Sequence, residues 1–478
     1  MFVGIDLGTS GVKVVAVDAD GRLAAKATAS YALDTPRPGW AEQDPERWWG
    51  ATVEATQRLT GDVDASQVRA IGLSGQMHTL VLLDEGGRPV RPAISWADTR
   101  TESQARRMRE RVPRETLVGA LGNPPATGFT APSLMWVKEH DASAYRAAAK
   151  LCLVKDYVRL RLTGAWATDP SDASATLLFD TFRRTWSDEV LEALELDAAL
   201  LPPVHASGDV AGELRTDAAA SLGLPRGTPV VTGAGDQAAA ATGCGLVDPG
   251  PMLVTLGSGG QVFTPLAAPA ADPELRVHLF CHAAPDRWHL QGAVQNMGVA
   301  LDWVRCTLGW SWEELYGRAA EIPAGAEGVT FLPYLTGERT PYMDPLARAA
   351  WSGLALSHTP AHMARAAIEG AAYAMADAIE ACTEAGGEPD EIALTGGGAE
   401  HALPRQILAD VVGRSLGRAQ VRDASAVGAA VLAGAPVPGF RSTEAEAPGP
   451  DAEAHRAAWR RQRDTYAAVR DARPSPAR

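Results

Sequence analysis

The chain has 478 residues, 46% of them apolar, and a formal net charge of −14; a chain of this length is expected to form two or three domains. The acidic balance excludes nucleic acid as the main partner, because phosphate backbones bind clustered Lys and Arg, and no apolar stretch reaches membrane-spanning length. The five cysteines have no metal-ligand spacing and no charged leader precedes the first strand, which favours a cytoplasmic protein with reduced thiols.

The first predicted elements are two strands around a small polar turn. Residues 2–5 and 12–17 are apolar, β-rich runs. The turn between them contains a carboxylate, two glycines and two hydroxyls: Asp6, Gly8, Thr9, Ser10 and Gly11. Backbone N–H groups and hydroxyls of such a turn can bind phosphate oxygens, and the carboxylate can hold the accompanying magnesium directly or through water. The alternative is an ordinary hairpin with a polar turn; we expect nucleotide binding.

The following segments alternate between helical and β-rich patterns, which predicts α/β architecture. Asp44, followed by proline, indicates the start of a helix. Residues 68–73 are predicted to form a buried strand. Residues 80–83 and 92–96 flank a Gly-rich turn and are predicted to form a hairpin.

Polar side chains gather after these strands. Gln76, Met77 and His78 follow the buried strand, and Asp98 follows the hairpin, next to Arg100. Amide and imidazole groups around an apolar side chain are typical of a polyol or sugar site. A lone histidine is more often structural, so this interpretation depends on Asp98 and Arg100 marking the same edge as a pocket.

A second carboxylate stands at a strand-to-helix junction. Residues 115–200 are mainly helical in pattern; residues 229–233 are then strand-like and precede Asp236, Gln237 and a helix of small residues. Because Asp236 would begin that helix, we expect the helix dipole to lower its pKa and keep it ionised at neutral pH. An ionised acid there could accept a proton from an alcohol during phosphoryl transfer. The alternative is that Asp236 is only a helix N-cap.

The second half of the chain begins like the first. Residues 252–262 repeat the order of apolar strand, Gly/hydroxyl turn and apolar strand, which is a weak internal repeat. Loops 8–11 and 257–260 could therefore clamp a triphosphate from both sides. The three glycines at 396–398 follow another strand, and without Cβ atoms they could let adenine lie against the backbone, or simply form a tight turn.

These patterns divide the chain into residues 1–245, residues 246–440 and a C-terminal remainder, 441–478. Residues 436–450, which cross the boundary at 440/441, are Pro-rich and are expected to be loose. A polar helix is expected from about 452 to 472, and a disordered tail after it.

Several segments resemble the FGGY family of carbohydrate kinases, and the likeness runs from Phe2 to about Gly434. They are GIDLGTSGVKV at 4–14, GQMH at 75–78, WSDEV at 186–190, GAGDQAA at 233–239, FCHA at 280–283, LPYLTGERTP at 332–341 and TGGGA at 395–399. The resemblance implies a duplicated, actin-like (ribonuclease-H-like) α/β fold with ATP in an interdomain cleft. The GQMH and GERTP elements point to the branch of the family that phosphorylates D-xylulose at its 5-hydroxyl.

The resemblance also implies roles for single residues. Asp236 resembles the general base, and Asp6 the residue that holds Mg²⁺. The expected sugar contacts, including those from the residue pattern itself, are Gln76, Met77, His78, Asp98, Asp236 and Gln237. The expected ATP contacts are Gly8, Thr9, Ser10, Lys13, Gly257, Ser258, Gly298, Gly397 and Gly398.

Three positions depart from the family pattern. Ser133 stands where Lys is usual, Thr79 where Gly is frequent, and loop 257–260 is Gly-Ser-Gly-Gly rather than Gly-Thr-Ser-Gly. The Thr79 departure lies beside the expected sugar contacts, so the reaction type is better specified than the sugar. Ribulose, gluconate, glycerol and erythritol remain alternative substrates, and an actin-like ATPase switch remains an alternative function. The expected partner is a small sugar, and a homodimer is one assembly compatible with the sequence.

Overall fold

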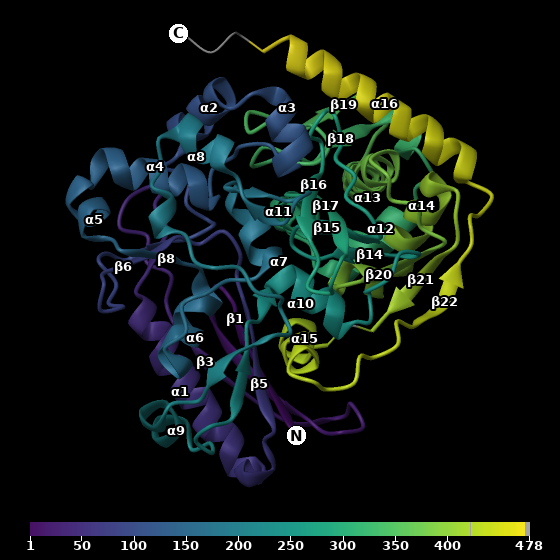
Figure 1. The fold of residues 1–478 in the computed structure, drawn as a ribbon. Coiled ribbons are helices and arrows are strands. Elements are labelled where there is room, and N and C mark those ends of the chain that lie inside the picture. The colour runs from purple at the N-terminus through teal and green to yellow at the C-terminus, as the bar shows by residue number, and fades with distance from the viewer. Residues whose placement is uncertain (421, 474–478) are drawn as a thin grey trace.

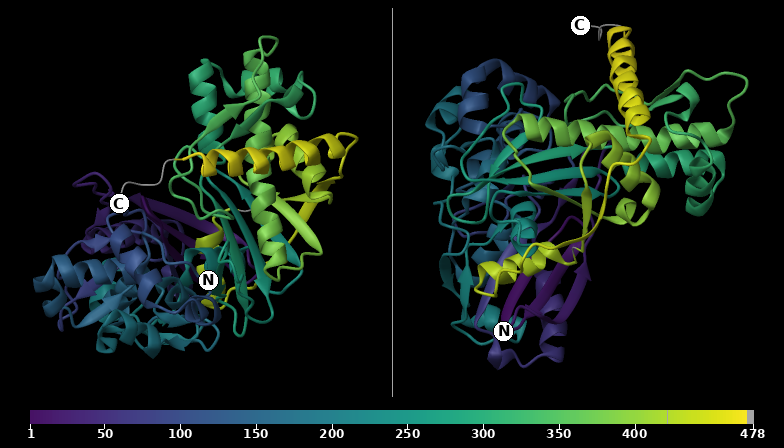
Figure 2. Two further views of the ribbon diagram at one scale, coloured as in Figure 1. Left: turned by 90° about the horizontal axis from the view of Figure 1, so that it is seen from above. Right: turned by 90° about the vertical axis from the view of Figure 1, so that its right-hand side faces the viewer.

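The computed structural model describes residues 1–420 and 422–473 (Figures 1 and 2). Two seven-stranded sheets organise the chain, one in each half. The helices are α1 (Pro45–Asp62), α2 (Glu102–Arg111), α3 (Arg114–Thr116), α4 (Thr130–His140), α5 (Ala142–Ala147), α6 (Val154–Thr163), α7 (Pro170–Ala173), α8 (Asp188–Leu194), α9 (Thr216–Leu222), α10 (Asp236–Gly243), α11 (Gly298–Leu308), α12 (Trp312–Ala320), α13 (Pro360–Glu384), α14 (Ala402–Val412), α15 (Ala424–Leu432) and α16 (Ala452–Asp471). In the part of the chain that the structure describes, no helix is long and apolar enough to span a membrane.

The first sheet has the order β11-β12-β5-β1-β2-β3, and β13 also pairs with β5. Its strands are β1 (Phe2–Leu7), β2 (Gly11–Val17), β3 (Leu23–Ser30), β5 (Ala70–Gly75), β11 (Val210–Glu213), β12 (Pro229–Val231) and β13 (Ala234–Gly235). β1, β2 and β3 form an antiparallel meander, whereas β5 runs parallel to β1 and to β13. The parallel strands β1, β5 and β13 therefore end at the same edge of the sheet.

The second sheet repeats this topology in the order β16-β17-β15-β14-β20-β21-β22. Its strands are β14 (Pro251–Leu256), β15 (Gly260–Leu266), β16 (His278–Cys281), β17 (Trp288–Val294), β20 (Glu391–Thr395), β21 (Leu416–Ala419) and β22 (Ser442–Glu446). β14, β15 and β17 form the antiparallel meander, and β20 runs parallel to β14. The order β12-β5-β1-β2-β3 thus corresponds to β21-β20-β14-β15-β17. The predicted α/β fold and the internal repeat are both confirmed.

Helices α10 and α15 lie between the two sheets, crossing each other at very short range (Figure 1). α15, from the second half, packs on β1 and β5 of the first sheet, while Ala241 of α10 shares a core cluster with Leu253 and Phe263 of the second sheet. Glycines allow this approach: a Cβ at Gly428 would lie 1.7 Å from the Ala239 carbonyl oxygen, and a Cβ at Gly72 would lie 1.8 Å from the Ala429 carbonyl oxygen. Each half therefore carries a helix that completes the core of the other.

The long segment between β5 and β11 adds helices and short strand pairs to the first half. Its short strands are β6 (Val81–Leu83), β7 (Ala93–Ile94), β8 (Lys150–Cys152), β9 (Phe179–Asp180) and β10 (Thr185–Trp186). The short strand β4 (Glu42–Gln43) precedes β5, and β18 (Thr330–Leu332) and β19 (Ala350–Ser352) pair in the second half. The predicted hairpin at 80–96 is irregular: β6 pairs with β8 and β7 with β4, and only single bridges such as Leu80 to Ile94 join the two arms. The apolar runs were identified correctly, but their partners come from distant segments.

The C-terminal remainder is part of the second half. The expectation of a loose stretch at 436–450 is corrected by β22, which pairs antiparallel with β21. The predicted polar helix is confirmed as α16, which lies across the surface of the second half (Figures 1 and 2). Its His455, Ala458, Gln462 and Tyr466 side chains are buried against that half. Most of the expected disordered tail lies outside the described residues.

Candidate active site

Three parallel strands bring two carboxylates to one edge of the first sheet. In the register of β1 and β5, Asp6 lies opposite Ser74, and Ser74 lies opposite Ala234 of β13. The Ser74 hydroxyl donates a 3.1 Å hydrogen bond to Asp6 Oδ1, and Asp236 follows β13 directly as the first residue of α10. Asp6 and Asp236 are therefore brought to neighbouring strand ends, although 229 residues separate them in the chain.

The environment of Asp236 raises its pKa to about 7, mainly through burial and further through the negative charge of Asp6. Hydrogen bonds from the backbone and side chain of Gln237 act in the opposite direction. The expected lowering by the helix dipole is therefore wrong in sign, because burial and a nearby carboxylate outweigh it. Gly235, rather than Asp236, occupies the N-cap position of α10.

Met77 packs directly against the backbone that precedes Asp236. A Cβ at Gly235 would lie 2.8 Å from Met77 Cγ, so only glycine admits this contact. His78, three residues after the end of β5, has a left-handed backbone with φ of 69°. Met77 of the predicted pair therefore lies beside the backbone that carries the predicted acid.

The hydrogen bonding of His78 defines which ring nitrogen is free. Nδ1 lies 2.6 Å from the carbonyl oxygen of Ala175, so Nδ1 carries the proton and donates it. Burial lowers the pKa of His78 to about 4, which keeps the ring neutral near neutral pH. Nε2 is therefore left as a hydrogen-bond acceptor, suited to a hydroxyl group.

Gln76 connects this region to the first turn. Its Nε2 donates a 2.7 Å hydrogen bond to Gln43 Oε1, and Gln43 Nε2 donates a 2.8 Å bond to the Thr9 carbonyl oxygen. The Thr9 hydroxyl accepts a 3.0 Å bond from the indole of Trp96. The Gln76 side-chain amide group therefore stabilises the turn at Thr9 through Gln43. Of its two side-chain polar atoms, only Oε1 lacks a partner among the described residues.

Two predicted contacts have other partners in the structure. Both carboxylate oxygens of the buried Asp98 accept hydrogen bonds from Arg100, and Oδ2 also accepts one from the Ala41 amide, so no oxygen is free for a sugar. The prediction that Asp98 contacts the sugar is therefore corrected: its carboxylate stabilises the loop that contains Arg100. Lys13 forms a 2.8 Å ion pair with Asp423 of the second half. This pair gives the Lys13 charge a partner across the two halves of the chain.

A chain of hydrogen bonds that the sequence did not reveal supports the turn before Asp236. The Gly235 amide donates a 3.0 Å bond to Ser171 Oγ, which donates to Asp169 Oδ2 at 2.5 Å. Asp169 also forms a 3.0 Å ion pair with the fully buried Lys155. Residues of the helical insertion therefore fix the backbone position from which Asp236 projects.

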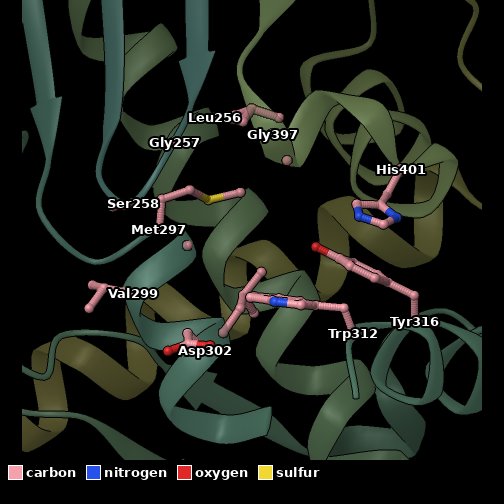
Figure 3. Close-up of a pocket in the computed structure, with 13 residues that line it drawn as sticks. Leu256, Gly257, Ser258, Met297, Val299, Asp302, Trp312, Tyr316, Gly397 and His401 are labelled. Carbon is pink, nitrogen blue, oxygen red and sulfur yellow. The ribbon is translucent and has the colours of Figure 1, made fainter. Parts of the chain in front are cut away.

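A cavity of about 670 Å³ brings together the predicted ATP contacts of the second half (Figure 3). It is lined by Gly257, Ser258, Gly298, Gly397 and Gly398. The Gly298 amide donates a 3.0 Å hydrogen bond to the Gly257 carbonyl oxygen, and a Cβ at Gly298 would lie 2.5 Å from that oxygen. The loop after β14 and the start of α11 therefore hold each other through contacts that require glycine.

Aromatic side chains form the opposite wall of this cavity (Figure 3). The rings of Tyr316 and His401 are stacked with centroids 3.9 Å apart, and those of Trp312 and Tyr316 are stacked at 5.9 Å. Sequence reasoning missed all three residues. The spacing of Trp312 and Tyr316, four residues apart on one helix, could have indicated a shared face. A glycine floor and aromatic wall suit a flat ring.

The donor set at Asp6 fits a magnesium ion that is carried by phosphates. Among the described residues, no group of three or more His, Cys, Asp or Glu side chains could hold a metal ion alone. Mg²⁺ is usually bound by one or two carboxylates together with water and substrate phosphates. Asp6 has one oxygen bonded to Ser74 and supplies such a carboxylate.

Comparisons with known proteins extend over nearly the whole chain. Residues 1–243 match the N-terminal domain of the FGGY family of carbohydrate kinases, and residues 252–436 match its C-terminal domain. The xylulose kinase of Escherichia coli (strain K12) is 41% identical over 435 residues, 91% of this chain and 89% of that protein. The xylulose kinase of Klebsiella pneumoniae is 39% identical and covers 98% of each chain. A solved structure from Brucella ovis, described as a xyloylose kinase, has a TM-score of 0.92 at 34% identity, with 98% of this chain and 99% of that chain covered.

Proposed function

The chain belongs to the FGGY family of carbohydrate kinases, and from this we propose that it transfers the γ-phosphoryl group of ATP to the 5-hydroxyl of D-xylulose. Curated xylulose kinases at 41% and 39% identity over most of the chain support this substrate. The observation that supports the proposal is the contact of Met77 with Gly235, the residue directly before Asp236.

In the proposed mechanism, Asp236 is the general base. Its carboxylate accepts the proton of the 5-hydroxyl while the oxygen attacks the γ-phosphorus in line; the bond to the β-γ bridging oxygen breaks and ADP leaves. Met77 packs against the sugar, and His78 Nε2 accepts a hydrogen bond from a sugar hydroxyl. Backbone N–H groups of loops 8–11 and 257–260 stabilise charge on the phosphates.

We assign the remaining predicted contacts to ATP and its metal. Asp6 would hold Mg²⁺, directly or through water, and the bound ion would neutralise charge on the phosphates. Thr9 and Ser10 contribute hydroxyls on one side, and Ser258 contributes one on the other. Adenine lies on Gly397 and Gly398 against the aromatic wall formed by Tyr316 and His401.

The raised pKa of Asp236 predicts the pH dependence of the reaction. A protonated Asp236 cannot accept a proton, so kcat/KM for D-xylulose should fall about tenfold per pH unit well below pH 7 and level off above it. The check is a profile of kcat/KM from pH 5 to 9 at saturating ATP. An acid limb centred near pH 4, the ordinary range of an aspartate, would contradict this environment for the base.

Loss of the aromatic wall should weaken ATP binding selectively. Replacing Tyr316 with Ala removes the ring stacked on His401, and we expect the KM for ATP to rise about tenfold, as for the loss of one base-stacking contact. Tyr316→Phe keeps the ring and should remain near wild type. Steady-state kinetics with each substrate varied separately tests this. A change in the KM for D-xylulose alone would place adenine elsewhere.

The sugar itself is tested by a substrate panel. A coupled assay of ADP release should give the highest kcat/KM with D-xylulose and lower values with D-ribulose, gluconate, glycerol and erythritol. A higher value for another sugar would reassign the substrate within the family. ADP release that no sugar changes would instead favour an ATPase that switches a binding surface.

A further inference from the structure

The GERTP segment of the second half has no role in the mechanism above, yet it is firmly built into the sheet. The Thr340 amide donates a 2.9 Å hydrogen bond to the Ala293 carbonyl oxygen, and the Ala293 amide donates a 3.0 Å bond to the Thr340 hydroxyl. The Gln295 amide donates to Glu338 Oε1 at 2.7 Å. The segment that carries Arg339 therefore follows the free edge of β17.

This position sets Arg339 next to His278. β16 pairs with β17 only up to His278, which lies opposite Gln291. The next edge positions, Ala293 of β17 and Gln295 just after it, are bonded by the GERTP segment instead. His278 and Arg339 are consequently neighbours along one edge, although 60 residues separate them in the chain.

His278 in turn shares a ring cluster with His78 from the first half. The Phe129 ring lies 4.3 Å from the His78 ring and 5.9 Å from the His278 ring, centroid to centroid. The Phe280 ring lies 6.1 Å from His78 and 5.8 Å from His278. Two phenylalanines thus bridge the histidines, and the cluster joins the two halves of the chain beside the Met77–His78 pair.

Arg339 is the charged group of this cluster. Its positive charge lowers the pKa values of both His78 and His278, in addition to the effect of their burial. Among the described residues, its guanidinium has no carboxylate within ion-pair distance and makes no side-chain hydrogen bond. The nearby Glu338 directs Oε1 to the backbone amides of Gln295 and Arg339. Arg339 is half-buried, and its five N–H donors lack protein acceptors among the described residues, which leaves them to water or to a ligand.

The position of that ligand follows from the order of these groups in the fold. Met77 contacts Gly235 directly before Asp236, and His78, the next residue after Met77, shares the ring cluster with His278. The segment that carries Arg339 lies at the edge of β17 beside His278, so the ring cluster lies between this segment and the carboxylates at the ends of β1 and β13. A sugar whose 5-hydroxyl meets Asp236 extends past His78 with its ketone end toward Arg339.

We propose that Arg339 binds the ketone end of the sugar, donating hydrogen bonds to the C2 carbonyl oxygen and the C1 hydroxyl oxygen. This inference rests on the proposed function and deepens it, because it names the group that selects a ketose. The guanidinium is a planar fork of donors only, and adjacent carbonyl and hydroxyl oxygens can accept from two of its N–H groups. A polyol loses the carbonyl acceptor, and a 1-deoxy sugar loses the hydroxyl.

The test compares variants of Arg339 on matched substrates. With Arg339→Ala we expect kcat/KM for D-xylulose to fall about 100-fold, mainly through KM, as for the loss of hydrogen bonds to a charged group. For 1-deoxy-D-xylulose the fall should be clearly smaller, because one acceptor is already missing. Arg339→Lys keeps the charge but loses the planar pair of donors, so its kcat/KM for D-xylulose should lie between those of the wild type and Arg339→Ala. The KM for ATP should stay within about twofold, which also shows that the variants are folded.

Arg348→Ala is the matched control, because Arg348 lies nine positions after Arg339, is exposed, and among the described residues its side chain bonds only the carbonyls of Pro345 and Ala347. It should leave all constants unchanged. Three results would overturn the assignment of Arg339 while leaving the kinase function intact. The first is an equal fall in kcat/KM of Arg339→Ala for D-xylulose and for its 1-deoxy analogue. The others are a rise in the KM for ATP and a change in kcat/KM for D-xylulose of less than twofold. A wild-type protein inactive on D-xylulose would overturn the proposed function and this inference together.

Discussion

Replacing Asp236 with asparagine should lower kcat for D-xylulose by at least about a hundredfold, the contribution expected of a positioned general base. The amide has nearly the same shape and can stay beside Gln237, but it cannot accept the proton of the attacking hydroxyl. Asp188→Asn is the matched control, because Asp188 is also the first residue of a helix, α8, and is exposed. Near-normal turnover of Asp236→Asn in a coupled assay would show that Asp236 is not the base.

The same variant should unfold at a higher temperature than the wild type above pH 7. The pKa of Asp236 is about 7 in the folded protein and about 3.8 in the unfolded chain, so ionisation costs folding free energy as the pH rises between these values. Near pH 3 the wild-type carboxyl is protonated in both states, and the difference should disappear. We expect the thermal midpoint of Asp236→Asn to rise relative to that of the wild type as the pH increases, while its activity is lost. This combination would show that the variant has lost the base and not the fold.

Replacing Gly428 with alanine should destabilise the protein strongly, by about 3 kcal/mol or more, because overpacking forces the backbone to move. The added Cβ would meet the Ala239 carbonyl oxygen at 1.7 Å, where α15 crosses α10. Since α10 begins at Asp236, any displacement of this crossing also moves the proposed base. We therefore expect a lower urea midpoint and lower activity together.

Gly50→Ala is the control for this substitution. Gly50 lies within α1, is exposed, and has no atom within 4 Å of the place that a Cβ would occupy. Alanine there should raise stability by about 0.5–1 kcal/mol through helix propensity alone. If Gly428→Ala had the same urea midpoint as Gly50→Ala, helices α10 and α15 would not be in the close contact that Gly428 allows.

Sequence patterns predicted the parts of the molecule that depend on neighbouring residues. The strand-turn-strand openings of both halves, the helix after Asp44 and the small-residue helix after Asp236 are all present. Gly257, Gly298, Gly397 and Gly398, which the resemblance assigned to ATP binding, line one cavity. Such features can be predicted because they depend on the local periodicity of apolar residues and on glycines in tight turns.

What the sequence could not supply depends on residues that meet only in the folded chain. The pKa of Asp236 is set by burial and by Asp6, so reasoning from the helix dipole alone gave the wrong sign. Asp98 is turned away from a sugar by Arg100 and Ala41, and β22 gains its order from pairing with β21. Arg339 reaches the cluster around His78 only through the edge of β17.

The most direct test of the account is to identify the product that the purified protein forms from ATP and D-xylulose. Nuclear magnetic resonance of the product from ¹³C-labelled sugar should show phosphorus coupled to C5, with one ADP formed per sugar phosphate, and Asp236→Asn should form it at least about a hundredfold more slowly. Phosphate at another carbon, or ADP formed without any sugar phosphate, would contradict the account.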